Sequence, residues 1–454
     1  MIELEDDLPP RRPRWLTRVV ALLAAVLLLA NLVRLGFDGG PAPDPSVAPS
    51  ASIEPTLSPS GTPRVARPLA GMPPAIRRVA REVERIRGLR FLEPVEVQIV
   101  SQRRLDRRLR ELVREALDPA EMARLGRTWT VLGLMDEGQS LLAAIEALHE
   151  GGVAGFYDDE TKELLVETTS PDRLSPAARY YVAHELTHAL TDQHHSLAPL
   201  RELAEGKGKS DQALAFRALV EGDAVLVAER YLRTYSASEI RALQAEIRAQ
   251  NESALARVPG ALLESFSFSY RAGTSFARHL HARGGFRAID RAYDRPPRTT
   301  AEILEPTSYP APAPARLPMN PPPMGWKVLA ADAFGEFDLG LVLKRDPRRP
   351  AVPASVADEA ADGWAGGRYR ASGRNGETVV EIALAFEDAA EAQEAADAID
   401  RYLAHRAGSS ASAYENGAWT GRTGQVAGAR LLDGERLRVL VATSERALDV
   451  HVER

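Results

Sequence analysis

The sequence contains no cysteine. Without thiols the chain cannot form disulfides, iron–sulfur clusters or cysteine-based zinc sites, and it has no cysteine nucleophile. A basic excess is also lacking, because 57 Lys and Arg residues stand against 63 Asp and Glu residues, a net charge of −6. This balance does not indicate a nucleic-acid partner. Any metal site must therefore be built from histidine and carboxylate side chains.

Long apolar runs are scarce, and the one strong run covers residues 16–37. A helix needs about 20 apolar residues to cross a bilayer. Arginines precede the run between residues 11 and 18, and Asp38 follows it, so residues 1–15 are expected in the cytoplasm and the later domains outside it. This predicts a single-pass protein of the cytoplasmic membrane with extracytoplasmic C-terminal domains. A cleaved signal peptide shows the same order of charge and apolarity and remains the alternative.

Two proline-rich stretches divide the rest of the chain. Residues 38–70 contain few large apolar side chains and are expected to form a disordered stalk. Residues 306–324 contain a second such stretch and are expected to connect two domains, 71–305 and 325–454. The predicted fold class is α+β, with a mostly helical domain followed by a smaller α/β domain.

Residue patterns predict individual elements. Helices are expected at 77–87, 103–117, 140–149 and 389–403, strands at 92–100, 378–386 and 436–443, and a β-hairpin over 155–167. Ser175 and Pro176 are typical of a helix start, so a further helix is expected from there to about His195.

That last helix contains His184-Glu185-Leu186-Thr187-His188. His184 and His188 are four residues apart, so both project from one face and could bind one tetrahedral ion. Glu185 is displaced around the helix and is better placed to reach an activated water than to bind the ion. The spacing is that of zincin peptidases, in which this glutamate is the general base. His194 and His195 are alternative ligands, but they lie beyond the two-turn face and are expected instead to form hydrogen bonds at the helix end.

A third ligand is needed, and Glu221 is the best candidate. It lies in the apolar segment 218–224, where an uncompensated carboxylate would be costly. The alternative is a solvated carboxylate at a helix end. Asp223 and Asp192 are candidates to accept a hydrogen bond from a ligating histidine.

Tyrosine hydroxyls are candidates for a further role. Tyr157 or Tyr270 could donate a hydrogen bond to the oxygen of a scissile carbonyl as it becomes tetrahedral. Tyr157 is chosen as the catalytic candidate, although either ring could simply be packed in the core.

The stretch His184 to Asp192 resembles the active-site helix of thermolysin-like gluzincins. The segment from Glu221 departs from that pattern, in which the supporting Asp lies four residues after the ligand Glu. In zincins an edge strand before this helix pairs with substrate, a role that Leu164–Glu167 could fill.

Over a longer stretch, the chain resembles a group of bacterial and archaeal surface proteins with zincin-like motifs. Their hallmarks resemble residues 155–158, 184–194, 218–224, 270–273 and 296–304. This resemblance implies a zincin fold with His184, His188 and Glu221 as ligands of Zn²⁺ and Glu185 as base.

The expected activity is zinc-dependent hydrolysis of a protein or peptide substrate outside the membrane. A non-catalytic envelope scaffold with a metal-stabilised zincin fold is the second hypothesis, and a structural ectodomain with an accidental motif is the third. Substrate, cleavage specificity and oligomeric state do not follow from the sequence.

Overall fold

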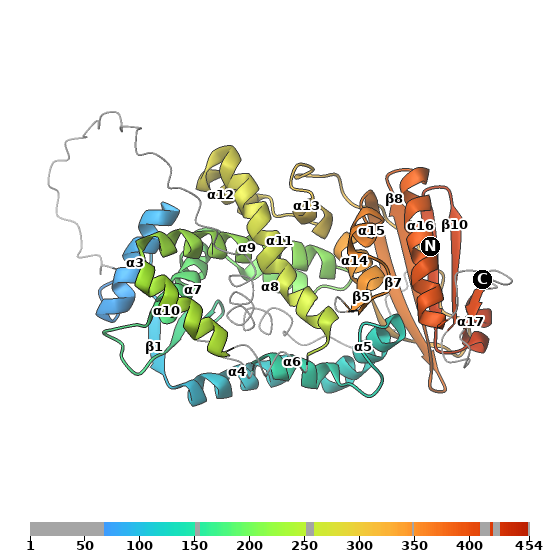
Figure 1. Ribbon diagram of the computed structural model, residues 1–454, viewed down its shortest axis with the longest axis horizontal. Coiled ribbons are helices and arrows are strands. Elements are labelled where there is room, and N and C mark those ends of the chain that lie inside the picture. The colour runs from blue at the N-terminus through green and yellow to red at the C-terminus, as the bar shows by residue number, and fades with distance from the viewer. Residues whose placement is uncertain are drawn as a thin grey trace.

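The computed structural model describes residues 68–149, 155–250, 258–346, 349–408, 418–420 and 427–452. Helices and sheets both occur in this part of the chain, so the predicted α+β class is confirmed. Figure 1 shows a mostly helical half beside a half that is built around a large sheet.

The helical half runs from residue 68 to the end of α13. Its helices are α3 (Pro74–Arg87), α4 (Gln102–Ala116), α5 (Pro119–Leu132), α6 (Leu141–His149), α7 (Pro176–His195), α8 (Ala198–Glu205), α9 (Ser210–Tyr231), α10 (Ala237–Gln250), α11 (Gly260–Gly284), α12 (Phe286–Asp294) and α13 (Thr300–Leu304), with the short 3-10 helix η1 (Leu232–Thr234). A small sheet is formed by β1 (Glu96–Val100), β2 (Gly155–Asp158) and β3 (Glu163–Glu167), in the order β1-β3-β2.

Helices α7 and α9 form the centre of this half. Residues 180–192 of α7 and 215–228 of α9 are buried without interruption. Helices that are buried on all sides have no solvated face for a charged residue. The polar side chains of these two helices must therefore find partners inside the protein.

Two glycines allow α9 to approach α11 closely. A β-carbon on Gly222 of α9 would lie 2.1 Å from the carbonyl oxygen of Gly273, and one on Gly273 of α11 would lie 2.1 Å from that of Ala218. Any side chain at either position would force the helices apart. Glu221 adjoins Gly222 in the sequence, and Tyr270 lies three residues before Gly273. The crossing of α9 and α11 therefore determines how these two side chains approach each other.

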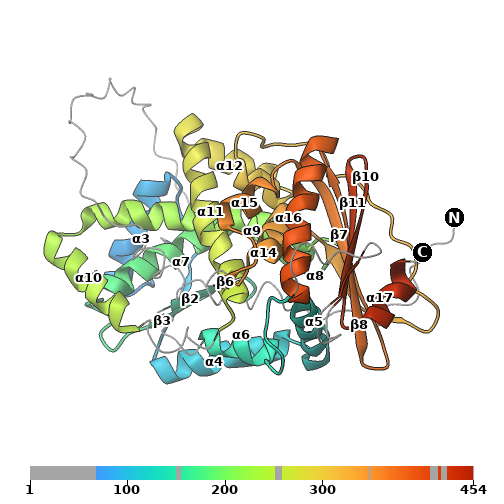
Figure 2. The ribbon, with the colours of Figure 1, turned by 45° about the vertical axis from the view of Figure 1, so that its right-hand side comes forward.

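The second half contains an antiparallel sheet in the order β4-β7-β8-β11-β10-β9. Its strands are β4 (Lys327–Ala333), β7 (Trp364–Arg374), β8 (Glu377–Phe386), β9 (Ala418–Thr420), β10 (Ala427–Asp433) and β11 (Arg436–Ala442), beside the two-residue pair β5 (Arg345–Asp346) and β6 (Arg349–Pro350). Its helices are α14 (Glu336–Lys344), α15 (Ala354–Glu359), α16 (Ala389–Ala407) and α17 (Glu445–Val452). Helix α16 covers one face of the sheet and α17 lies at the other (Figure 2).

The two halves share one hydrophobic core. Phe268 of α11 packs on Phe337 of α14, with ring centroids 4.4 Å apart. The hydroxyl of Tyr402 on α16 donates to the carbonyl of Leu132, 2.9 Å away, and Arg406 donates to the preceding carbonyl of Val131 at 2.9 Å. These two side chains satisfy carbonyls at the C-terminal end of α5, where a cation is also favourable.

The proline-rich stretch 306–324 lies against the sheet. The amide of Ala315 donates to the carbonyl of Ala365 at 2.8 Å, and Arg368 of β7 donates to the carbonyl of Leu317 at 3.4 Å. The predicted connection is therefore packed against the large sheet.

The predicted localisation in a membrane needs correction. Among the residues that the structure describes, no helix combines the length and the apolar character that crossing a bilayer requires. The segment 16–37, on which that prediction depended, lies outside the described residues, as do 1–15 and the stalk up to residue 67.

The predicted edge strand is also wrong. Strand β3, which contains Leu164–Glu167, is the central strand, with β1 parallel on one side and β2 antiparallel on the other. Its backbone is thus paired on both sides. Strands β2 and β3 both contact α7, and of these two β2, the first arm of the hairpin, lies at an edge of the sheet.

Candidate metal centre

The two histidines of α7 face each other across one helical turn. Ser175 caps the helix, with its hydroxyl oxygen accepting from the amide of Ala178 at 3.2 Å, and Pro176 opens its first turn, as the sequence predicted. The Nε2 atoms of His184 and His188 lie 3.0 Å apart, and the rings are almost perpendicular at 88°. Both rings therefore direct the same nitrogen to one point.

Glu221 of α9 completes the cluster from the neighbouring helix. Its Oε2 lies 3.2 Å from Nε2 of His184 and 3.5 Å from Nε2 of His188. All three side chains are buried, and together they could hold a metal ion. The structure thus brings together the three predicted ligands.

The spacing of these atoms fits a small tetrahedral cation. Zinc bonds of about 2.0–2.1 Å in tetrahedral geometry would separate neighbouring ligand atoms by about 3.3 Å. The observed separations of 3.0, 3.2 and 3.5 Å bracket this value. Two imidazoles and one carboxylate suit zinc, although other transition metals accept the same donors.

The charges in the cluster are tightly linked. Burial alone would raise the pKa of Glu221, but His188 and His184 outweigh it and lower that pKa to about 2. Burial alone would lower the pKa of His188, yet the Glu221 carboxylate raises it to about 9. Burial and the neighbouring His188 lower the pKa of His184. Without a metal, one proton is therefore shared within the cluster near neutral pH.

Glu185 lies beside the three ligands and is held by the hairpin. Its Oε2 accepts a hydrogen bond from the backbone amide of Tyr157, 3.0 Å away. Burial raises the pKa of Glu185 to about 7, against the lowering effects of His188 and that hydrogen bond. A carboxylate with this pKa can both take and return a proton near neutral pH.

The Tyr157 hydroxyl does not face the metal ligands. It donates to Oδ2 of Asp192 at 2.8 Å. Asp192 also pairs with Lys162 and accepts from the amide of Leu197 at 2.9 Å. In the described part of the chain, Asp192 therefore joins α7 to the hairpin and the following loop, and its hydrogen bonds do not go to a ligating histidine.

Asp223 is fully buried two residues after Glu221. Its carboxylate faces Arg87 of α3, Thr191 of α7 and Tyr293 of α12. The Asp223 charge contributes to the raised pKa of His188, which shows that the two groups are near each other.

Two further polar residues lie near the cluster. The ring of Tyr270 lies 6.3 Å from that of His184, and burial together with Glu221 and Glu185 raises the pKa of Tyr270 well above its usual value. Arg217, one turn before Glu221, is buried, and burial lowers its pKa to about 10 despite the attraction of Glu221. Sequence reasoning did not single out Arg217, although its spacing of four from Glu221 was a usable signal.

The two histidines at the end of α7 have other contacts. Nε2 of His194 lies 2.8 Å from the carbonyl oxygen of Arg90, while His195 stacks on Tyr293 with ring centroids 4.9 Å apart. The contact of His194 is the hydrogen bond that was predicted at the helix end, whereas His195 packs on a ring and its Nε2 lies 3.4 Å from Oδ1 of Asp290.

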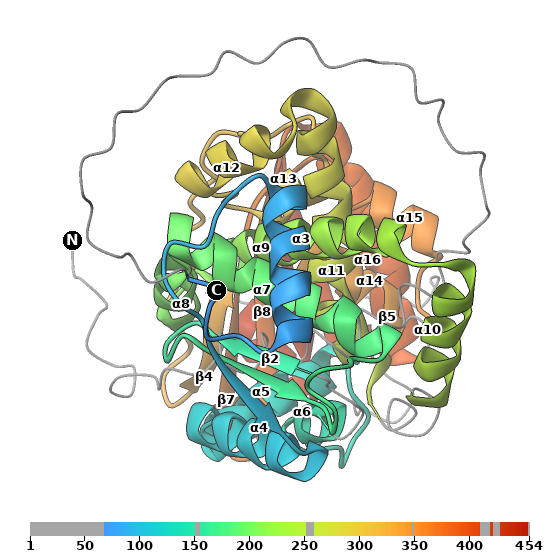
Figure 3. The same ribbon diagram turned by 90° about the vertical axis from the view of Figure 1, so that its left-hand side faces the viewer.

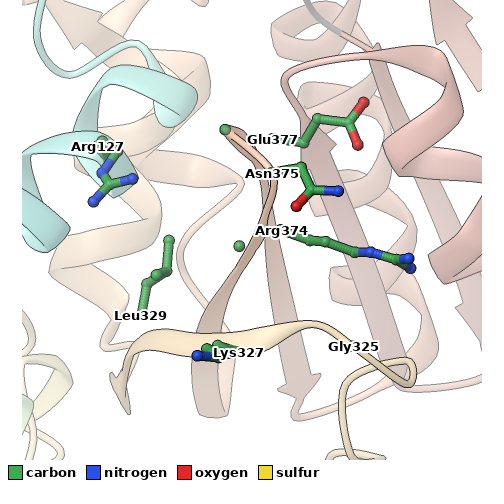
Figure 4. A pocket seen from close by; sticks show the side chains of 9 residues that line it. Arg127, Gly325, Lys327, Leu329, Arg374, Asn375 and Glu377 are labelled. Atoms are coloured by element: carbon green, nitrogen blue, oxygen red, sulfur yellow. The ribbon is translucent and has the colours of Figure 1, made fainter.

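A separate pocket of about 320 Å³ lies where α5 approaches the hairpin of β7 and β8. Arg127, Lys327 and Arg374 are among its lining residues. The side chain of Arg374 extends away from that of Arg127 (Figure 4), so these two arginines do not converge on one ligand.

Comparisons with known proteins address only the second half of the chain. Residues 327–451 match a protein-family model described as a domain of unknown function, DUF8575. The matched range begins with β4 and ends within α17. Neither curated proteins nor solved structures gave a match.

Proposed function

We propose that this protein is a zinc-dependent peptidase that resembles zincins, with His184, His188 and Glu221 as ligands and Glu185 as general base. The observation that carries this proposal is the convergence of two Nε2 atoms and one carboxylate oxygen, 3.0–3.5 Å apart, in a buried site. When bound, zinc supplies a Lewis acid that polarises a carbonyl group and acidifies water.

Glu185 supplies the acid–base chemistry. The amide of Tyr157 fixes its carboxylate next to the ligands, and the pKa of about 7 lets it accept a proton from water near neutral pH. The same carboxyl group then returns that proton to the leaving amine. A surface glutamate with an ordinary pKa would hold the proton taken from water less well before passing it to the amine.

Tyr270 is the better tyrosine for stabilising the oxyanion. Its ring lies beside His184, whereas the Tyr157 hydroxyl is occupied by Asp192. The high pKa keeps the Tyr270 hydroxyl protonated, as a hydrogen-bond donor must be.

A scaffold with a structural metal is the second candidate. The burial of the ligands favours it, since His184 and Glu221 are only 1% and 3% exposed. Such a protein would bind the same ion and would not cleave peptides.

The deciding experiment compares wild type with Glu185→Gln in the full chain. Each protein is analysed for bound zinc by mass spectrometry and is then incubated with a peptide library, with and without a chelator. We expect both proteins to contain zinc and only the wild type to cleave, because the ligands survive the substitution and the base does not.

Two results would count against the peptidase. Cleavage by Glu185→Gln at the wild-type rate would exclude Glu185 as base. Zinc in both proteins without chelator-sensitive cleavage in either would favour the scaffold.

A further inference from the structure

A buried arginine of α3 contacts the helix that provides Glu221. Arg87 is the last residue of α3, and its side chain has no exposed surface. Its Nε lies 3.0 Å from Oδ1 and 3.1 Å from Oδ2 of Asp223. Its guanidinium also lies over the ring of Phe286, 4.9 Å from the ring centroid. A buried guanidinium requires such a counter-charge, so Arg87 and Asp223 form a unit.

Asp223 connects α9 to α7 beside the metal ligands. The hydroxyl of Thr191 on α7 lies 3.4 Å from Oδ2 of Asp223. Thr191 follows His188 by three residues, and Asp223 follows Glu221 by two. The link therefore lies within one turn of a ligand on each helix, where it can set the distance between the histidines and the glutamate.

Two more groups hold this carboxylate in place. The hydroxyl of Tyr293 on α12 donates to Oδ2 of Asp223 at 3.3 Å. Nη2 of Arg87 donates to Oδ1 of Asp290 at 2.6 Å, which fixes the guanidinium from its outer side. Figure 3 shows α3 beside α7 and α9, and α3 contacts both of these helices. Arg87 at its end contacts Asp223 of α9.

We infer that Arg87 is a positioning residue of the metal centre, which acts through Asp223 to fix α7 against α9. Without the guanidinium, Asp223 would remain as a buried charge without its counter-charge and would be drawn away from Thr191. The ligand atoms would then lose their preset spacing, and the affinity for metal would fall. This inference rests on the metal binding proposed above.

The test measures zinc affinity of the full chain by competition with a chromophoric chelator. In Arg87→Met the side chain keeps its length and loses its charge. We expect the affinity to fall about 10-fold, the lower end of the range for groups that contact a metal ligand directly, because Arg87 acts through Asp223. Arg87→Lys keeps the charge but loses the planar guanidinium, so its zinc affinity should lie between those of wild type and Arg87→Met. Arg85→Met is the matched control, because Arg85 lies on the same helix with an exposed side chain that pairs with Glu82 at the surface. Its affinity should stay within about twofold of wild type.

Substitution of zinc by Co²⁺ adds a measurement that does not depend on the overall stability of the protein. The visible absorption of protein-bound Co²⁺ reports the geometry of its ligands, and we expect it to change in Arg87→Met and not in Arg85→Met. Should Arg87→Met fail to fold, Tyr293→Phe removes a single hydroxyl from Asp223 without leaving an unpaired charge. It should then show the same changes on a smaller scale.

The outcomes separate the possibilities. Arg87→Met, or Tyr293→Phe in its place, could fold with lower thermal stability but with the zinc affinity and Co²⁺ spectrum of wild type. The contact between Arg87 and Asp223 would then be merely structural, and the inference would be overturned. A wild type that takes up neither zinc nor Co²⁺ would overturn the proposed metal centre and this inference together.

Discussion

At the scale of single residues, His188 and Glu221 shift each other's pKa. The carboxylate raises the pKa of His188 to about 9, while the histidines lower that of Glu221 to about 2. A raised histidine pKa stabilises the metal-free fold fully below about pH 6.5, the usual histidine value, and that stabilisation is lost as the pH rises through 9. The proton on His188 thus replaces the cation when no metal is bound.

Metal uptake should therefore release about one proton at pH 7. A ligating imidazole must be neutral, His188 is protonated beforehand, and the lowered pKa of His184 leaves it without a proton to lose. Calorimetry of zinc binding in buffers of different ionisation enthalpy gives the number directly. The measurement is best made in Glu185→Gln, since Glu185 has a pKa of about 7 and could release a proton of its own. Uptake without proton release would contradict His188 as a ligand.

Helix packing determines how the ligands meet. Glu221 reaches the histidines because α9 lies against α7, and Tyr270 approaches them because α11 crosses α9 at Gly222 and Gly273. The absence of a side chain at these two positions is thus a requirement of the site as well as of the fold.

Alanine at either crossing position should lower stability. In Gly273→Ala the new β-carbon would lie 2.1 Å from the carbonyl oxygen of Ala218, a backbone atom that cannot move aside without shifting the helix. We expect a loss of about 1–3 kcal/mol in urea unfolding, the usual range for overpacking. Gly126→Ala in α5 is the control, because its β-carbon would meet Leu141 at an ordinary 3.5 Å. Alanine also favours helix over glycine, so the control should unfold no earlier than wild type.

At the scale of the whole molecule, the boundary between the two halves contains one buried acid, Asp211, and two half-buried ones, Glu336 and Asp338. Burial raises the pKa of Asp211 on α9 to about 6, that of Asp338 on α14 to about 7 and that of Glu336 on α14 to about 8. Thr300 and the amide of Gly335 hold two of these carboxyl groups by hydrogen bonds. These acids favour the protonated form in the folded state.

This boundary should weaken as the pH rises. Since the folded-state pKa values exceed the ordinary values of 3.8 and 4.5, the stabilisation is complete below about pH 4 and is lost progressively as the pH rises from there through the folded-state values of about 6 to 8. Wild type should unfold at lower urea concentration at pH 8.5 than at pH 5.5. Asp338→Asn and Glu336→Gln should each reduce that difference, whereas Glu359→Gln at an exposed site should not. Equal urea midpoints for wild type at pH 5.5 and pH 8.5 would contradict a role of these acids in the pH dependence of stability.

The sequence by itself determined the local parts of the candidate site. Ser175, Pro176 and the helical period fixed the helix that carries His184 and His188, because capping and side-chain direction depend on neighbours within a few residues. Glu221 was identifiable because a carboxylate inside an apolar segment requires a partner. The hairpin over 155–167 also followed from its own residues.

Only the tertiary structure decided which of these parts touch. It made β3 the central strand, joined the Tyr157 hydroxyl to Asp192, and placed Arg87 against Asp223, 136 residues further along the chain. Such contacts depend on how helices and strands pack, and packing results from the shape of many buried side chains together. No local pattern of residues records it, which is why the three candidate ligands could be predicted from the sequence and the contacts of Arg87 and Asp192 could not.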